Sequence, residues 1–215
     1  QTPAAFEEYK GLVWDRDNQP AQEVHFHFRK GITSIFMLPT GMAYQFDRTH
    51  YPAGYVHDQK QLRPAEQAKL DALREQIRQE TYRMDMELVG ANPHAPITAK
   101  GKSEDYVNYY NRNTLNVYRF QQLTYHDIYP GIDWVMYTTE QGLKYDFIVH
   151  SGADPNQIQL RFKDHEHLTL NADGSFTLSN RMGSITEQAP ISFQGEQAVK
   201  TAFQLQGNMI TFQLG

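Results

Sequence analysis

The sequence contains no cysteine, so it holds no disulfide, zinc–thiolate site, iron–sulfur cluster or thiol nucleophile. Basic charge is not in excess either: 20 Lys and Arg stand against 25 Asp and Glu, for a net charge of −5. A nucleic-acid binder needs a concentrated basic surface, so we expect no nucleic-acid partner. No apolar run approaches the roughly 20 residues that span a bilayer, so we expect no membrane span in this segment.

Familiar catalytic motifs are also missing. The sequence has no Gly-x-Ser-x-Gly elbow, phosphate-binding glycine loop, dinucleotide fingerprint or His-Glu-x-x-His helix, and we expect no enzymatic activity and no cofactor. Two His-x-His pairs, His25/His27 and His165/His167, could each point two imidazoles the same way from a strand and hold a metal. Neither pair has a third ligand at an obvious spacing, so we expect structural histidines and no metal.

Aromatic residues are abundant: 13 Tyr, 12 Phe and 2 Trp among 215 residues. The length allows one large domain or two small ones, and aromatics favour pleated, half-buried surfaces. Short alternating segments recur at intervals of 8–12 residues with turn residues between them. The sequence therefore predicts a mainly β protein, with antiparallel β-sandwich-like sheets. The predicted strands are 24–29, 32–38, 42–46, 83–89, 106–110, 117–123, 132–137, 143–150, 158–162, 168–170, 176–178, 185–187, 191–193, 199–205 and 209–214.

One segment has helical rather than strand periodicity. Apolar positions spaced 3, 4, 4, 3 and 4 residues apart run from Leu70 to Leu88, and Pro64 suits a first helical turn. We predict an amphipathic helix near 64–81 that packs on the sheets. We expect one β-rich module over 1–215. Its possible sub-units are a β-meander over 1–50 and a β-sandwich over 84–215, joined by a linker and helix over 51–83.

The predicted hairpin 132–150 suggests a polar cluster. The apolar side chains of its two strands share one face only if the numbers of two directly opposite residues sum to an odd value. A two-residue turn at Gln141-Gly142 would give such a register. The other face would then place Asp133 opposite His150 and Tyr137 opposite Asp146. These four residues are our candidate binding site. The alternative is a solvated face with ordinary cross-strand pairs.

Three turns have residues with a structural mechanism. Within 127–133, Pro-Gly supplies a turn with a positive φ, and Asp127 or Asp133 could accept backbone N–H bonds that lock the corner. We assign structural rather than catalytic roles to Asp127, Pro130, Gly131, Asp154, Pro155, Asp173 and Gly174.

Several of these stretches together resemble a bacterial domain of unknown function. That domain precedes SBBP-type β-propeller repeats in large exported proteins, and it occurs in proteins that end in a gliding-motility-associated sorting domain. The resemblance rests on ordered motifs: Tyr-His-Asp-Ile-Tyr-Pro-Gly-Ile-Asp at 125–133, Leu-Lys-Tyr-Asp-Phe-Ile-Val at 143–149, Gly-Ala-Asp-Pro at 152–155, Asp-Gly at 173–174 and Gly-Ser-Ile-Thr-Glu at 183–187. It implies export and a secreted or cell-surface setting, and it supplies no catalytic residues.

From the residues and the resemblance we expect a non-catalytic, N-terminal structural or adhesion module of a large secreted or cell-surface bacterial protein. The chain stops inside a predicted strand, so we expect it to be part of a longer chain. Its partners would be other domains of that chain, or a surface glycan or protein. Two alternatives stay open. A glycan-binding module would need coplanar exposed aromatics, and a glycoside hydrolase would need two carboxylates about 5–10 Å apart in a cleft.

Overall fold

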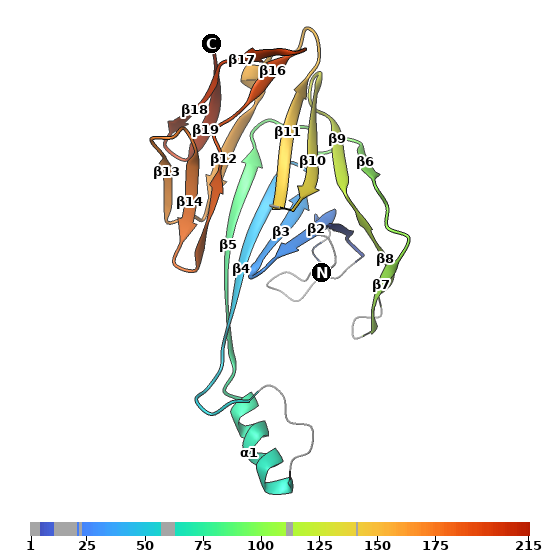
Figure 1. The fold of residues 1–215 in the computed structure, drawn as a ribbon, viewed down its shortest axis with the longest axis vertical. Coiled ribbons are helices and arrows are strands. Elements are labelled where there is room, and N and C mark those ends of the chain that lie inside the picture. The colour runs from blue at the N-terminus through green and yellow to red at the C-terminus, as the bar shows by residue number, and fades with distance from the viewer. Residues whose placement is uncertain (1–4, 11–20, 22, 57–62, 111–113, 141) are drawn as a thin grey trace.

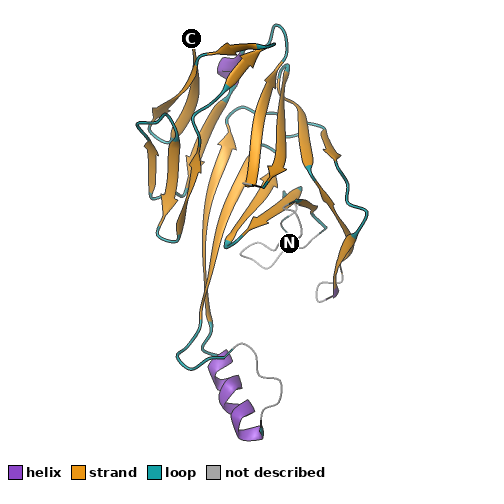
Figure 2. Ribbon diagram, in the orientation of Figure 1, coloured by secondary structure: helices purple, strands orange, loops and turns teal. Residues whose placement is uncertain are grey.

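The computed structural model describes residues 5–10, 21, 23–56, 63–110, 114–140 and 142–215. It is mainly β, with several antiparallel sheets and one α-helix in these residues (Figures 1 and 2). This is the predicted sandwich-like class.

The largest sheet contains ten strands, and each hydrogen-bonded pair in it is antiparallel. In this sheet β5 (Arg78–Leu88) pairs with β4 (Gly41–His50) on one side and with β12 (Gln159–Lys163) on the other. Strands of both predicted sub-units therefore share this sheet. Its order is β18 (Thr201–Gln206), β19 (Met209–Leu214), β12 (Gln159–Lys163), β5 (Arg78–Leu88), β4 (Gly41–His50), β3 (Thr33–Leu38), β2 (Phe26–Lys30), β1 (Phe6–Glu8), β8 (Thr114–Phe120) and β7 (Tyr106–Tyr109).

Three smaller sheets complete the described fold. The four-stranded sheet has the order β11 (Gly142–Val149), β10 (Ile132–Thr139), β9 (Gln122–Tyr129) and β6 (Ile97–Lys100). A three-stranded sheet contains β13 (His167–Leu170), β14 (Phe176–Asn180) and β15 (Gly183–Glu187). A ribbon pairs β16 (Ser192–Gln194) with β17 (Gln197–Val199), and a 3₁₀ turn, η2, spans Pro155–Gln157.

One large apolar core joins the ten-, four- and three-stranded sheets. Every second side chain along the strands is buried and contributes to this core. In β5 these side chains are Met84, Met86 and Leu88, which are almost fully buried, as is Trp134 of β10. Because each strand turns every second side chain inward, the alternation in the sequence becomes a continuous core between sheets.

Most predicted strands occur within a few residues of their expected ends. The predicted strand 117–123 is wrong as a single strand, because it is divided between β8 and β9, which belong to different sheets, and 199–205 likewise spans the end of β17 and most of β18. The strands β1 and β6 and most of β9 were not predicted.

The predicted helix is too long. The helix α1 spans Pro64–Arg74, and Glu66 caps it by accepting the N–H of Arg63 at 3.0 Å. From Arg78 the chain is β5, which pairs with β4 over ten residues. Met84 and Leu88, two apolar positions of the predicted stripe, therefore belong to a strand whose pairing outweighs helical periodicity, and Ile77 lies just before this strand. The prediction that the helix packs on the sheets is also wrong, since α1 lies apart from the body (Figure 1).

A two-stranded arm carries this helix. The β3 strand pairs with β4 only up to Phe46, and β12 pairs with β5 only from Asp85. Beyond these limits β4 and β5 continue together, ending in the pair His50–Arg78. We call residues 47–81 the arm. The described part of the chain holds no helix with the length and apolar character of a membrane span.

Candidate functional site

The predicted polar cluster lies on one face of the β10–β11 hairpin, but its register differs from the prediction. Asp133 lies opposite Ile148 and Tyr137 opposite Lys144, each two positions from the expected partner. The prediction of the shared face is correct, because a shift of two residues leaves every side chain on the same side of the sheet.

The turn explains the shift. Thr139 pairs with Gly142, so the two connecting residues are 140 and 141 rather than 141 and 142. Gln141 itself lies outside the described residues. The expected contacts form diagonally instead: His150 reaches Asp133, and Asp146 hydrogen-bonds Tyr137. Diagonal neighbours across a strand pair lie within reach of long side chains.

Asp133 is the centre of the first contact. Its Oδ2 lies 3.2 Å from Nε2 of His150 and 3.5 Å from Nδ1 of His126, and Oγ1 of Thr98 lies 2.9 Å from Nε2 of His126. Burial raises the pKa of Asp133. The N–H of Asp127 and the two imidazoles outweigh burial, so the pKa of this carboxyl lies below its ordinary value. The result is a carboxylate shared by two imidazoles at an exposed sheet face.

Tyr137 and Asp146 form a separate contact. Partial burial, followed by the carboxylate of Asp146, raises the pKa of Tyr137. Tyr137 follows Asp133 by four residues, which corresponds to roughly 13 Å along a strand. The four predicted residues therefore make two separate pairs rather than one cluster.

The predicted turn residues accept backbone donors. Asp133 Oδ1 accepts the N–H of Asp127 at 2.9 Å, and Asp127 Oδ1 accepts the N–H of Gly131 at 3.1 Å. Asp127 has a φ of +48°, so these bonds hold a backbone conformation that a non-glycine residue rarely adopts. Asp154 and Asp173 similarly accept N–H groups two residues later, and Gly131 and Gly174 have positive φ.

Replacing Asp133 tests its role at this corner. We expect Asp133→Ala to lower the free energy of unfolding by about 1–2 kcal/mol, because a backbone donor loses its acceptor at a strained residue. The more exposed His150→Ala should cost no more than about 0.5 kcal/mol. Urea unfolding at pH 7 measures both, and equal effects of the two substitutions would contradict this assignment.

The two His-x-His pairs do not converge. His25 contacts Tyr125 of the large core, whereas His27 stacks on Phe36, which belongs to a separate apolar cluster with Val24 and Ala43. Burial lowers the pKa of both imidazoles. His165 precedes β13 and His167 is exposed within it. Among the residues that the structure describes, no group of three His, Asp or Glu side chains is arranged to hold a metal.

A shallow hollow bears on the hydrolase alternative. It has a volume of about 240 Å³ and lies beside β4 and β5, with the carboxylates of Asp85 and Glu87 at its wall. Asp85 pairs with Arg83 at 2.7 Å, and Glu87 pairs with Lys163 at 2.7 Å. Both carboxylates of this hollow are therefore engaged by cations.

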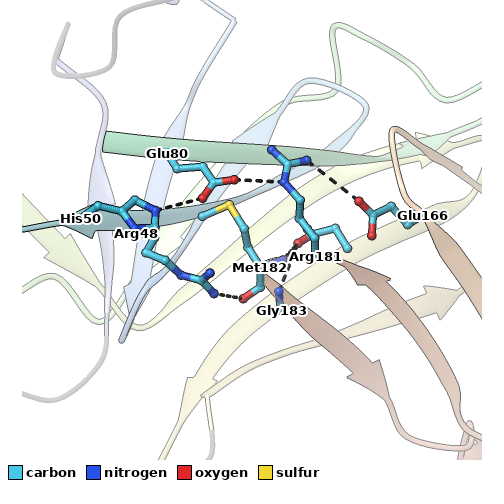
Figure 3. Close-up of polar contacts among 8 residues, drawn as sticks. Arg48, His50, Glu80, Glu166, Arg181, Met182 and Gly183 are labelled. Atoms are coloured by element: carbon cyan, nitrogen blue, oxygen red, sulfur yellow. Dashed lines mark hydrogen bonds and ion pairs between the residues drawn. The ribbon is translucent and has the colours of Figure 1, made fainter. Parts of the chain in front are cut away.

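The structure also reveals a site that the sequence did not indicate, the base of the arm. The turn between β14 and β15 reaches it: Arg181 Nε donates to Glu80 at 3.0 Å, and Arg48 donates to the carbonyl of Met182 at 3.3 Å (Figure 3). Glu80 also lies 3.1 Å from Nε2 of His50, and the hydrogen bonds of His50 and Arg181 lower the pKa of Glu80. We call Arg48, His50, Glu80, Arg181 and Met182 the brace.

Packing reinforces the brace. The guanidinium of Arg181 lies 4.8 Å from the ring centroid of Tyr82, and Met182 is buried in the core. A Cβ added to Gly183 would come within 2.7 Å of the ring of Phe46, so this turn fits closely against the root of the arm. The three-stranded sheet thus fixes the direction in which the arm leaves the body.

The comparisons with known proteins place the chain in one family. A family model described as "Domain of unknown function (DUF7948)" matches residues 6–215, which include every described strand. No curated protein and no solved structure matches the chain.

Proposed function

We propose that this chain, which belongs to the DUF7948 family of domains of unknown function, is a non-catalytic structural and adhesion module of a larger exported bacterial protein. The setting follows from the resemblance of its Pro-Gly-Ile-Asp and Ala-Asp-Pro motifs to a domain found beside SBBP repeats in exported proteins. Its proposed partners are other domains of the same chain and components of the cell surface.

The braced arm carries this proposal. In the strand ladders, residues 47–50 pair with 78–81 and with no other described strand, so the arm extends past the sheet and places α1 away from the core (Figure 1). An isolated two-stranded ribbon is marginally stable in water. The chain nevertheless supports it with an ion pair, a cation–π contact and a capped helix.

The direction of the arm matters for this role. A ribbon that moved freely would lose conformational entropy on meeting a partner, whereas a ribbon fixed by Arg181 and Glu80 loses less. A prealigned projection with an exposed helix at its end is suited to contact with a neighbouring domain or surface.

Removing the end of the arm separates its role in folding from its role in contact. We expect a variant with residues 51–77 replaced by Asn-Gly, which suits a two-residue hairpin turn after the His50–Arg78 pair, to keep its unfolding free energy within about 1 kcal/mol. In the full-length protein the same deletion should reduce attachment of the bacteria to a surface at unchanged protein level.

Two further observations would reject the proposed function. An antibody to the chain should label intact cells, and labelling only after lysis would contradict export. The purified chain should release no sugar from a panel of aryl glycosides and polysaccharides, and turnover of any of them would favour the hydrolase alternative.

A further inference from the structure

The hairpin of β7 and β8 exposes tyrosine rings that the core does not use. Tyr106 and Tyr110 are 51% and 80% exposed. Tyr110 directly follows β7, beyond an irregularity in the β7–β8 ladder, and the side chain of Asn108 reaches its hydroxyl. Tyr118 of β8 pairs directly with Tyr106 across the strands. We call Tyr106, Asn108, Tyr110, Tyr118 and the adjacent Lys102 the tyrosine face.

The side chains of the tyrosine face are held by one another. Nδ2 of Asn108 donates to the hydroxyl of Tyr110 at 3.3 Å, and Oδ1 of Asn108 accepts the N–H of Asn116 at 2.9 Å. The rings of Tyr106 and Tyr118 meet edge to face at 6.0 Å. Because these contacts fix the rings before any ligand arrives, little side-chain entropy would be lost on binding.

A cation lies over the ring of Tyr118. Nζ of Lys102 lies 3.5 Å from the ring centroid of Tyr118. The surface therefore combines flat aromatic faces with an amide and an ammonium group, all at one edge of the ten-stranded sheet.

This combination matches the chemistry of a sugar. One side of a pyranose ring presents C–H groups, which are attracted to the electron-rich face of an aromatic ring, and its hydroxyls accept and donate hydrogen bonds at the rim. Tyrosine also anchors protein interfaces. What favours a sugar here is the rim of hydrogen-bonding phenol, amide and ammonium groups around the rings.

We propose that the tyrosine face is a carbohydrate-binding surface, with Tyr106 and Tyr110 stacking on successive parts of a polysaccharide chain and Asn108 and Lys102 contacting its hydroxyl or carboxylate groups. The surface lies on a different hairpin from the arm, so its function is separate from the contact proposed for the arm.

Affinity electrophoresis of the whole chain through gels containing soluble polysaccharides tests the proposal. The panel should include a cellulose derivative, a mannan, a xylan, a soluble chitin derivative and a polyuronate. We expect at least one to retard the chain, and Tyr106→Ala with Tyr110→Ala to weaken that binding at least about tenfold. Circular dichroism should show that the double variant remains folded.

Tyr51→Ala is the matched control, because Tyr51 is 48% exposed but directly follows β4 at the end of the arm. It and the arm-end deletion should both keep the binding of the unaltered chain. Three results would overturn the proposal: no retardation by any member of the panel, unchanged binding in the double tyrosine variant, or an equal loss in Tyr51→Ala. Loss of attachment in the arm deletion alone would leave the function of the arm standing.

Discussion

Trp134→Ala should lower the free energy of unfolding by about 3–5 kcal/mol, among the largest effects expected from one substitution in this chain. Trp134 is fully buried in β10, with ring centroids of Tyr125, Tyr145 and Phe147 at 5.3, 6.2 and 6.3 Å. Truncation leaves a cavity that these large rings cannot fill without leaving their own positions. A loss of this size is a large part of the 5–15 kcal/mol that stabilises a typical domain.

Trp134→Phe is the matched control. Among the described residues, no acceptor meets the indole N–H of Trp134, so phenylalanine keeps a ring in the core and removes an unpaired donor. We expect it to cost no more than about 1.5 kcal/mol. Urea unfolding followed by far-UV circular dichroism compares the two variants. A Trp134→Ala protein within 1 kcal/mol of the unaltered chain would contradict the packing role.

Alternation in the sequence was a reliable guide where a strand has one buried face. Val135 and Tyr137 alternate with the buried Trp134 and Met136 in β10, and the predicted boundaries there were close. The helical interpretation extended too far beyond Leu73, because a spacing of four residues, as between Met84 and Leu88, fits one face of a helix and also one face of a strand. The ten-residue pairing with β4 decides the outcome, and no local pattern reports it.

The candidate sites differ in how much of each the sequence could predict. The corner around Asp127 and Asp133 is local. Its turn residues and its carboxylate acceptors all lie within the seven residues 127–133, so the sequence alone predicts it. The brace is not local: Glu80 and Arg181 lie 101 residues apart, and each alone is typical of a solvated face. Only the packing of the three-stranded sheet against the root of the arm brings them together.

Glu187 gives the second large effect, and it depends on pH. Glu187 ends β15. After burial, its carboxylate is a further cause that raises the pKa of Tyr44 in β4 and of Tyr145 in β11, so Glu187 lies where three sheets meet. Burial raises the pKa of Glu187 from 4.5 to about 7. At a pH between 4.5 and about 7, the carboxyl of Glu187 is therefore protonated in the folded chain and ionised in the unfolded chain.

The raised pKa of Glu187 makes the folded state less stable as pH rises. Between pH 4.5 and about 7 Glu187 holds more of its proton in the folded state than in the unfolded state, so its contribution to stability is greatest below pH 4.5 and is lost as pH rises through this window. At about 1.4 kcal/mol per pH unit, the window corresponds to about 3 kcal/mol. Because glutamine never ionises, Glu187→Gln should match the unaltered chain at pH 4 and exceed its stability by about 3 kcal/mol at pH 8.

Chemical unfolding at pH 4, 6 and 8 measures this difference, and Glu196→Gln serves as its control, because Glu196 is exposed in the β16–β17 turn. All carboxylates titrate in the unaltered chain, so only the difference between it and the Glu187→Gln variant isolates the buried group. That difference should grow between pH 4 and 8, while the difference for Glu196→Gln stays flat. Parallel curves for Glu187→Gln would show that its carboxyl is hydrated at the junction, and that the three sheets do not close over it.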